Sequence, residues 1–146
     1  MEHLLERWEP HLQSPEGEGL AHLAEIFAEV QRHLARHFRR EEEIFYPALQ
    51  PLLAPTDVEI SKLTDDHSDV RETSAAFQQL LDQAQSAAEP AASLRSDLAT
   101  VGWALWNHIH HHIAVEENGL LAFADRALPS DRQAELAQQM EHLTDL

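Results

Sequence analysis

Two segments of the chain each combine a histidine and a glutamate at a spacing that suits metal binding. His37 and Glu41 lie in HLARHFRREEEIFYP, and His112 and Glu116 lie in HIAVEENGLL. The members of each pair are four positions apart (i, i+4), so an α-helix places the imidazole and the carboxylate on one face, one turn apart. Each pair can therefore offer two ligands to a metal ion.

Helical periodicity places these residues among apolar ones. Scarce glycine and proline-marked breaks predict five helices, at residues 2–13, 18–50, 57–87, 91–127 and 131–143. The apolar stripe of the third helix contains Ile60, Leu63, His67, Val70, Ser74, Phe77 and Leu81. The stripe of the second contains Leu23, Ile26, Val30, His33, His37, Glu41 and Ile44. The stripe of the fourth contains Leu94, Leu98, Val101, Leu105, His108, His112 and Glu116.

Polar residues in the middle of three apolar stripes need an explanation. Burying an imidazole or a carboxylate costs free energy unless the group is paired or binds a metal. A single buried histidine such as His67 is more often a hydrogen-bonded core residue. Together with His37, Glu41, His112 and Glu116 on the same interior, it favours a metal site. The fold class that we predict is all-α, an up-down antiparallel four-helix bundle with a short first helix and a short fifth, C-terminal helix, forming one domain over residues 1–146.

Composition limits the partners. The chain has 26 acidic and 10 basic residues, a formal net charge of −16, and no cysteine. This charge repels phosphate backbones and anionic lipids, so we expect neither nucleic acid nor a membrane as a partner. The absence of thiols suits a reducing compartment, and MEHLLERWEP lacks the pattern of a signal peptide. We therefore expect a cytoplasmic protein.

The ligand chemistry favours iron, or manganese in its place. The cluster offers nitrogen and oxygen but no sulfur, and its two glutamates could bridge two ions in the core of a helix bundle. A structural zinc site is the main rival, although zinc usually takes four ligands in a closed tetrahedron. A single iron ion with open positions stays an alternative.

Three segments resemble the hemerythrin-like, or HHE cation-binding, domains from about Leu20 onward. These segments are HFRREEEIFYPAL, HIAVEENGLLAFA and, more weakly, DDHSDVRE. The resemblance implies a four-helix bundle around a non-haem di-iron centre. Its cofactor would be two iron ions, ferrous or ferric, which an oxo group can bridge, with manganese or zinc as substitutes. It also implies that His37 binds one iron, that Glu41 and Glu116 bridge, and that His67 and His112 bind the second iron.

Two neighbouring carboxylates leave the register of the bridging residues open. Glu42 follows Glu41, and Glu117 follows Glu116. Helical phase favours Glu41 and Glu116, because they stand one turn from their histidines on the same face.

The chain departs from the oxygen-carrying members of this family at two places. They carry a second histidine one turn after the first on the third helix, but this chain has Arg71 four residues after His67. Fewer ligands leave open positions on iron, which favours reaction with O2, NO or peroxide over reversible O2 carriage. The family also supplies a histidine from the first helix, where His3 would lie about 12 Å from the level of His37 at 1.5 Å per residue. Either the natural protein is longer, or another group completes the site.

His33 and His108 stand one turn before the two motif histidines. We expect them to orient ligands rather than to bind metal themselves. Tyr46 lies close to the cluster in sequence and could hydrogen-bond a bound oxygen species, but packing is its default role.

Three functions follow from these residues. The first is a di-iron protein that senses or reacts with a small diatomic ligand or peroxide. The second is a di-iron enzyme that turns over peroxide or NO, or that repairs iron–sulfur clusters. The third is a metal-free or zinc-stabilised helical interaction module whose acidic face binds a basic partner. The sequence leaves open the ligand, the number of metals, the redox partner and whether the chain forms a homo-oligomer.

Overall fold

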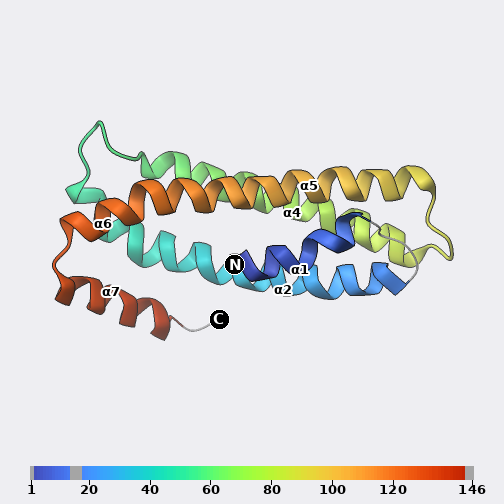
Figure 1. Cartoon of the computed structure of the whole chain (residues 1–146), viewed down its shortest axis with the longest axis horizontal. Coiled ribbons are helices and arrows are strands. Elements are labelled where there is room, and N and C mark those ends of the chain that lie inside the picture. Colours follow the sequence, from blue (N-terminus) through green and yellow to red (C-terminus); the bar gives the residue numbers. More distant parts are fainter. Residues whose placement is uncertain (1, 14–17, 144–146) are drawn as a thin grey trace. The chain divides into compact units, whose positions relative to one another are not determined.

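The computed structural model describes residues 2–13 and 18–143, and all regular structure in these residues is helical (Figure 1). The five main helices of the described residues are α1 (Glu2–Gln13), α2 (Glu18–Arg40), α4 (Ile60–Ser86), α5 (Ala92–Val115) and α7 (Ser130–His142), of which α1 and α7 are the short ones. The prediction of an all-α fold is confirmed, and the elements are consistent with a helical bundle that ends in a short C-terminal helix. None of the described helices combines the length and the apolar composition that a bilayer crossing requires.

Irregular turns divide two of the predicted long helices. After α2 come a π-helical turn, η1 (Glu41–Phe45), a short helix, α3 (Tyr46–Leu49), and a 3₁₀ turn, η2 (Gln50–Leu52). After α5 come a second π-helical turn, η3 (Glu116–Leu121), and a short helix, α6 (Ala122–Ala127). The sequence predicted one uninterrupted helix in each place. The predicted break between the first two helices, at residues 14–17, lies outside the described residues.

Helix α4 begins at Ile60, three residues later than predicted. Asp57 forms a turn just before it: the Ala54 N–H donates to Asp57 Oδ2 at 2.7 Å, and the Asp57 N–H donates to the Ala54 carbonyl at 2.9 Å. An aspartate that binds the backbone in this way stabilises a turn at the expense of a helix.

The chain groups into two compact units. The first unit contains Met1–Leu34 and Ser68–His110, and the second contains Ala35–His67 and His111–Leu146. The limits between them fall inside α2, α4 and α5, so each of these three helices contributes residues to both units.

The core of the first unit contains three aromatic side chains among many aliphatic ones. The side chains of Trp8, Phe27 and Phe77 are fully buried. The rings of Phe27 and Phe77 meet edge to face with centroids 4.6 Å apart, and the Trp8 ring lies 5.5 Å from that of Phe77. Gly102 allows this close packing, because a Cβ there would lie 3.0 Å from Phe77 Cε2 and 2.4 Å from Leu12 Cδ2.

The second unit has a smaller apolar core beside a group of polar residues. Its buried apolar cluster comprises Phe45, Tyr46, Leu49, Ile60, Leu63, Leu120 and Ala124. Val58 packs against this cluster and also against the π-helical turn η3. A Cβ on Gly119 of η3 would lie 2.6 Å from Val58 Cγ2, so only glycine lets the loop before α4 approach this turn.

Candidate metal centre

Four polar residues are buried in the second unit. Glu41, His67, His112 and Glu116 are between 0% and 7% exposed, and they come from η1, α4, α5 and η3 respectively. His37, near the end of α2, lies at the edge of this group with its side chain 37% exposed. The structure thus brings together all five residues that the sequence predicted as ligands.

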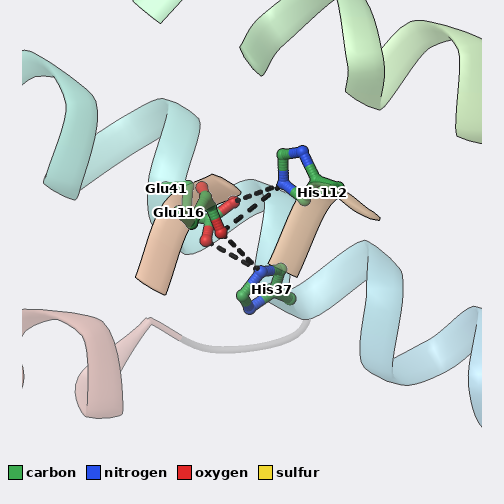
Figure 2. A group of neighbouring side chains, drawn as sticks. All are labelled: His37, Glu41, His112 and Glu116. Atoms are coloured by element: carbon green, nitrogen blue, oxygen red, sulfur yellow. Dashed lines mark ion pairs between the residues drawn. The ribbon is translucent and has the colours of Figure 1, made fainter. Parts of the chain in front are cut away.

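Both predicted His–Glu pairs face one another. Figure 2 shows the imidazoles of His37 and His112 directed at the carboxylates of Glu41 and Glu116. His37 Nε2 lies 2.8 Å from Glu41 Oε1 and 3.5 Å from Glu116 Oε2. His112 Nε2 also lies 3.5 Å from Glu116 Oε2. One ligand atom from each of the four residues lies within 4.8 Å of the others, a grouping that could hold a metal ion.

His67 joins this group from α4. Its Nε2 atom lies 3.0 Å from Glu41 Oε2 and 3.0 Å from His112 Nε2. Its ring stacks on Phe38, with centroids 3.8 Å apart, and on Tyr46, with centroids 5.6 Å apart. Because two aromatic rings stack on it and its side chain is fully buried, the imidazole has little freedom to rotate away from the cluster.

Glu42 and Glu117, which directly follow Glu41 and Glu116 in the sequence, do not point into the cluster. Glu42 Oε1 lies 2.8 Å from His67 Nδ1, on the side of the ring that faces away from the cluster. A carboxylate at this position fixes the tautomer and the orientation of a metal-binding histidine. Glu117 is exposed. Asp66 takes a place similar to that of Glu42, with Oδ2 lying 3.5 Å from His112 Nδ1.

Tyr46 is a central residue whose contacts the sequence did not predict. Its hydroxyl donates a hydrogen bond of 2.5 Å to Glu116 Oε1 and lies 3.2 Å from both Glu41 Oε2 and His67 Nε2. Tyr46 is five positions after Glu41 (i, i+5), and on a regular α-helix this spacing would place the two side chains on different faces. The one available signal was its chemistry, because a buried tyrosine hydroxyl usually has a hydrogen-bond partner.

The two π-helical turns explain this position. One starts at Glu41 and the other at Glu116, and the Tyr46 N–H bonds to the Glu41 carbonyl, five residues back. A π-helical turn holds an additional residue, so the side chains that follow are rotated about the helix axis. Phe45 and Tyr46 are therefore buried, whereas Ile44, which the α-helical pattern placed inside, is only partly buried. Such turns occur frequently at functional sites.

The predicted orienting role of His33 and His108 is wrong. Both side chains are exposed, and His33 Nδ1 lies 3.0 Å from the Glu29 carbonyl of its own helix. The neighbouring apolar residues Leu34 and Ile109 occupy the inward positions instead. His3 is also exposed, in the first unit, with its Nδ1 atom 3.8 Å from Glu6 Oε2.

Mutual attraction shifts the pKa values of the cluster. Burial disfavours a charged His37, but the hydrogen bonds and charges of Glu116 and Glu41 outweigh burial and raise its pKa to about 9. The same balance, with Glu41 as the main partner, raises the pKa of His112. Burial would raise the pKa of Glu41, yet hydrogen bonds from His112, His37 and His67 lower it. Burial and the two glutamate charges raise the pKa of the Tyr46 hydroxyl.

The donor set fits a metal centre. Imidazole nitrogens and carboxylate oxygens suit divalent iron, manganese and zinc, and a cation would replace the protons that otherwise balance the two glutamates. The Nε2 atoms of His67 and His112 face one another at 3.0 Å. Two unprotonated nitrogens would repel each other at this distance, so a proton or a metal cation must lie between them. These residues can therefore hold a metal ion between them.

Comparison with known proteins agrees with this geometry. The family described as the hemerythrin HHE cation-binding domain matches residues 1–124. No curated protein and no solved structure gave a significant match. The matched span includes α1 to α5, both π-helical turns and all five clustered residues, but not α7. This chain therefore belongs to the hemerythrin HHE cation-binding domain family.

Proposed function

We propose that this protein binds two iron ions and uses them to sense or to react with O2, NO or peroxide, rather than to carry O2 reversibly. In this proposal His37 serves one iron, His67 and His112 serve the other, and Glu41 and Glu116 bridge the two. Manganese or zinc could substitute, because the donor atoms suit them as well.

The observation that carries the proposal is the position of the Glu41 carboxylate. Its Oε1 atom faces His37 Nε2 at 2.8 Å, and its Oε2 atom faces His67 Nε2 at 3.0 Å. A carboxylate whose two oxygens face different histidines has the arrangement of a bridging ligand in the core of a helix bundle.

The other residues of the centre have separate tasks. Bound iron would supply open coordination positions and electrons to a small ligand. Phe38 and Tyr46 cover the faces of His67 and exclude water there, and Glu42 fixes the His67 ring through Nδ1. The Tyr46 hydroxyl keeps a proton beside Glu116 Oε1. His37, on the exposed side of the cluster, belongs to the metal position with the fewest protein ligands, where an external ligand would bind.

Metal content tests the proposal directly. Protein made in iron-replete cells should contain about two irons per chain, as expected for a di-iron bundle, and anomalous scattering should identify the element and its position. His112→Ala should lose metal, whereas His108→Ala, an exposed residue one turn earlier on α5, should not. A folded protein that takes up neither iron nor manganese would refute the proposal.

Turnover of peroxide or NO at the same centre is the second candidate. The partial exposure of His37 favours it, because a substrate must reach and leave the centre repeatedly. Steady-state peroxide or NO consumption by the iron-loaded protein, lost in His37→Ala and kept in His33→Ala, would support an enzyme. Inactivity with both substrates, at full iron content, would leave sensing as the function.

A further inference from the structure

A cavity of about 370 Å³ lies next to His37 in the second unit. His37, Glu41 and Glu116 line part of it, so the cavity is continuous with the candidate metal centre. Most of the remaining wall is apolar and comprises Phe45, Ile113, Leu121, Ala137 and Met140. Such a cavity, apolar with a few converging polar groups, is typical of a small-molecule site.

Helix α7 supplies a part of this wall that the family match does not include. Ala137, Met140 and Glu141 lie on α7, whereas the match ends at residue 124. Leu136 of α7 is buried, and α7 contacts the π-helical turn η1 that carries Glu41. The width of the cavity at this wall therefore depends on α7.

The size of the cavity exceeds what the small ligands of the proposed function need. One water molecule takes up about 30 Å³ in the liquid, and O2, NO and hydrogen peroxide are of similar size. The cavity is roughly ten times larger than this volume. Its apolar wall also offers nothing to hydrogen peroxide, but it would bury a hydrocarbon group with a favourable free energy.

The charges around the cavity favour a neutral ligand. The charged side chains that line it are two cations, His37 and Arg40, and four glutamates: Glu41, Glu116, Glu117 and Glu141. This excess of negative charge, together with the formal net charge of −16 of the chain, disfavours an anion. Arg40 also lines the cavity, and its Nε atom is buried without a hydrogen-bond partner among the described residues. This N–H can donate to an uncharged oxygen of a ligand, and doing so would satisfy a buried donor.

We propose that this cavity binds a neutral organic hydroperoxide, with its hydrocarbon group against the apolar wall and its oxygens toward Arg40 and His37. The choice of a hydroperoxide as the ligand rests on the proposed function. The shape, the apolar wall and the preference for a neutral molecule do not, since they follow from the cavity itself.

Binding of an unreactive analogue tests the proposal without relying on activity. The probe is 2-phenyl-2-propanol, the alcohol that corresponds to cumene hydroperoxide, titrated into zinc-loaded and metal-free protein by calorimetry and saturation-transfer NMR. Ala137→Trp places an indole in the cavity from an exposed position on α7. It should weaken binding about tenfold or more, a difference that both methods resolve.

Two controls make the result specific. Ala134→Trp is the same change at an exposed residue of α7 that does not line the cavity, and it should leave binding unchanged. In the metal-free protein, benzoate, an anion of similar size, should bind at least about tenfold more weakly than the alcohol because of the acidic lining. Ala137→Leu fills less space and should give an intermediate loss, which decides the question should the tryptophan variant fail to fold.

The outcomes separate this inference from the proposed function. Alcohol binding by a protein that takes up no iron would support the cavity and refute the di-iron proposal. Full iron content without alcohol binding would overturn the inference alone. Equal binding by the wild type and a folded Ala137→Trp would also overturn it, as would benzoate binding to the metal-free protein as tight as that of the alcohol.

Discussion

The two compact units fill their interiors with opposite chemistry. In the first unit, Trp8, Phe27 and Phe77 pack ring against ring. In the second, imidazoles from α2, α4 and α5 and carboxylates from the π-helical turns η1 and η3 converge on one another. Ser74 is the one fully polar side chain buried in the described part of the first unit, against four in the second. Helical periodicity thus sets which face is buried, and residue type sets whether burial yields packing or a binding site.

This contrast implies different sources of stability. Aromatic packing gains free energy from burial and dispersion whatever is bound. A buried group of imidazoles and carboxylates loses the free energy of its solvation by water. Only hydrogen bonds, bound protons or a metal ion can offset this loss. We therefore expect the first unit to respond to changes in volume and the second to changes in metal and pH.

The largest effect should come from truncating the aromatic core. Phe77→Ala removes a fully buried ring that contacts Trp8 and Phe27, and should lower the free energy of unfolding by about 3–5 kcal/mol. Denaturant unfolding should show this loss in metal-loaded and metal-free protein alike. Gln79→Ala, at an exposed position on the same helix, should change little. A loss that appears only in one metal state would break the proposed contrast between the units.

Metal removal should have the next largest effect. Free metal at one hundred times its dissociation constant stabilises the folded state by about 2.7 kcal/mol, so chelation should lower the melting temperature clearly. Calorimetry of both forms measures this shift. Phe77→Ala should keep the shift and His112→Ala should lose it, because only the latter change removes a proposed ligand. Equal melting of the loaded and metal-free proteins would contradict metal coupling.

Two hydroxyl deletions compare the units more finely. Tyr46→Phe removes the donor to Glu116 Oε1 and should cost about 1–2 kcal/mol in the metal-free protein, since a buried carboxylate oxygen loses its partner. Ser74→Ala removes a buried Oγ that has no hydrogen-bond partner among the described residues. This change should not lower the free energy of unfolding, because no bond is lost and a buried hydroxyl without a partner is removed. If Tyr46→Phe lowered the free energy of chemical unfolding no more than Ser74→Ala does, the hydrogen bonds of Tyr46 in the cluster would add no stability.

Sequence periodicity predicted the buried face of α4 correctly. The stripe from Ile60 through His67 to Leu81 is buried at every predicted position. Helix α4 has no π-helical turn, so spacings of three and four keep their phase along its length. In α2 and α5, each motif histidine is preceded by two residues, three and four positions earlier, either of which could face the interior. Leu34 and Ile109 are buried rather than His33 and His108, because an apolar side chain loses no solvation when it is buried.

The sequence predicted the five clustered residues of the candidate site, but it predicted neither the contacts of Tyr46 nor the cavity. The pairing of His37 with Glu41 and of His112 with Glu116 follows from helical spacing, and the structure brings both pairs and His67 together. Their roles as ligands stay a prediction. The position of Tyr46 depends on the π-helical turn η1, which helical periodicity does not predict. The cavity depends on how α7 packs against the second unit's other helices.

The smallest effect concerns pH. The pKa of His37 is raised to about 9 in the folded protein, because Glu116 and Glu41 outweigh its burial, against an ordinary value of about 6.5 for an unfolded chain. The folded state therefore binds the proton more tightly. This contribution to stability is complete below pH 6.5 and is lost as the pH rises toward 9. Because the side chain is 37% exposed, solvent screens the attraction, and the loss should stay at about 1 kcal/mol or less.

Unfolding of the metal-free protein across this pH range tests the assignment. The free energy of unfolding should fall as the pH rises, and His37→Ala should reduce the fall, with the remainder coming from His112, whose pKa is also raised. His22→Ala, an exposed residue of the first unit, should leave the fall intact. With metal bound the dependence should reverse, because the metal must displace the His37 proton and so binds more tightly at higher pH. If stability rises with pH in the metal-free protein as well, then the two glutamates do not hold His37 in its charged form.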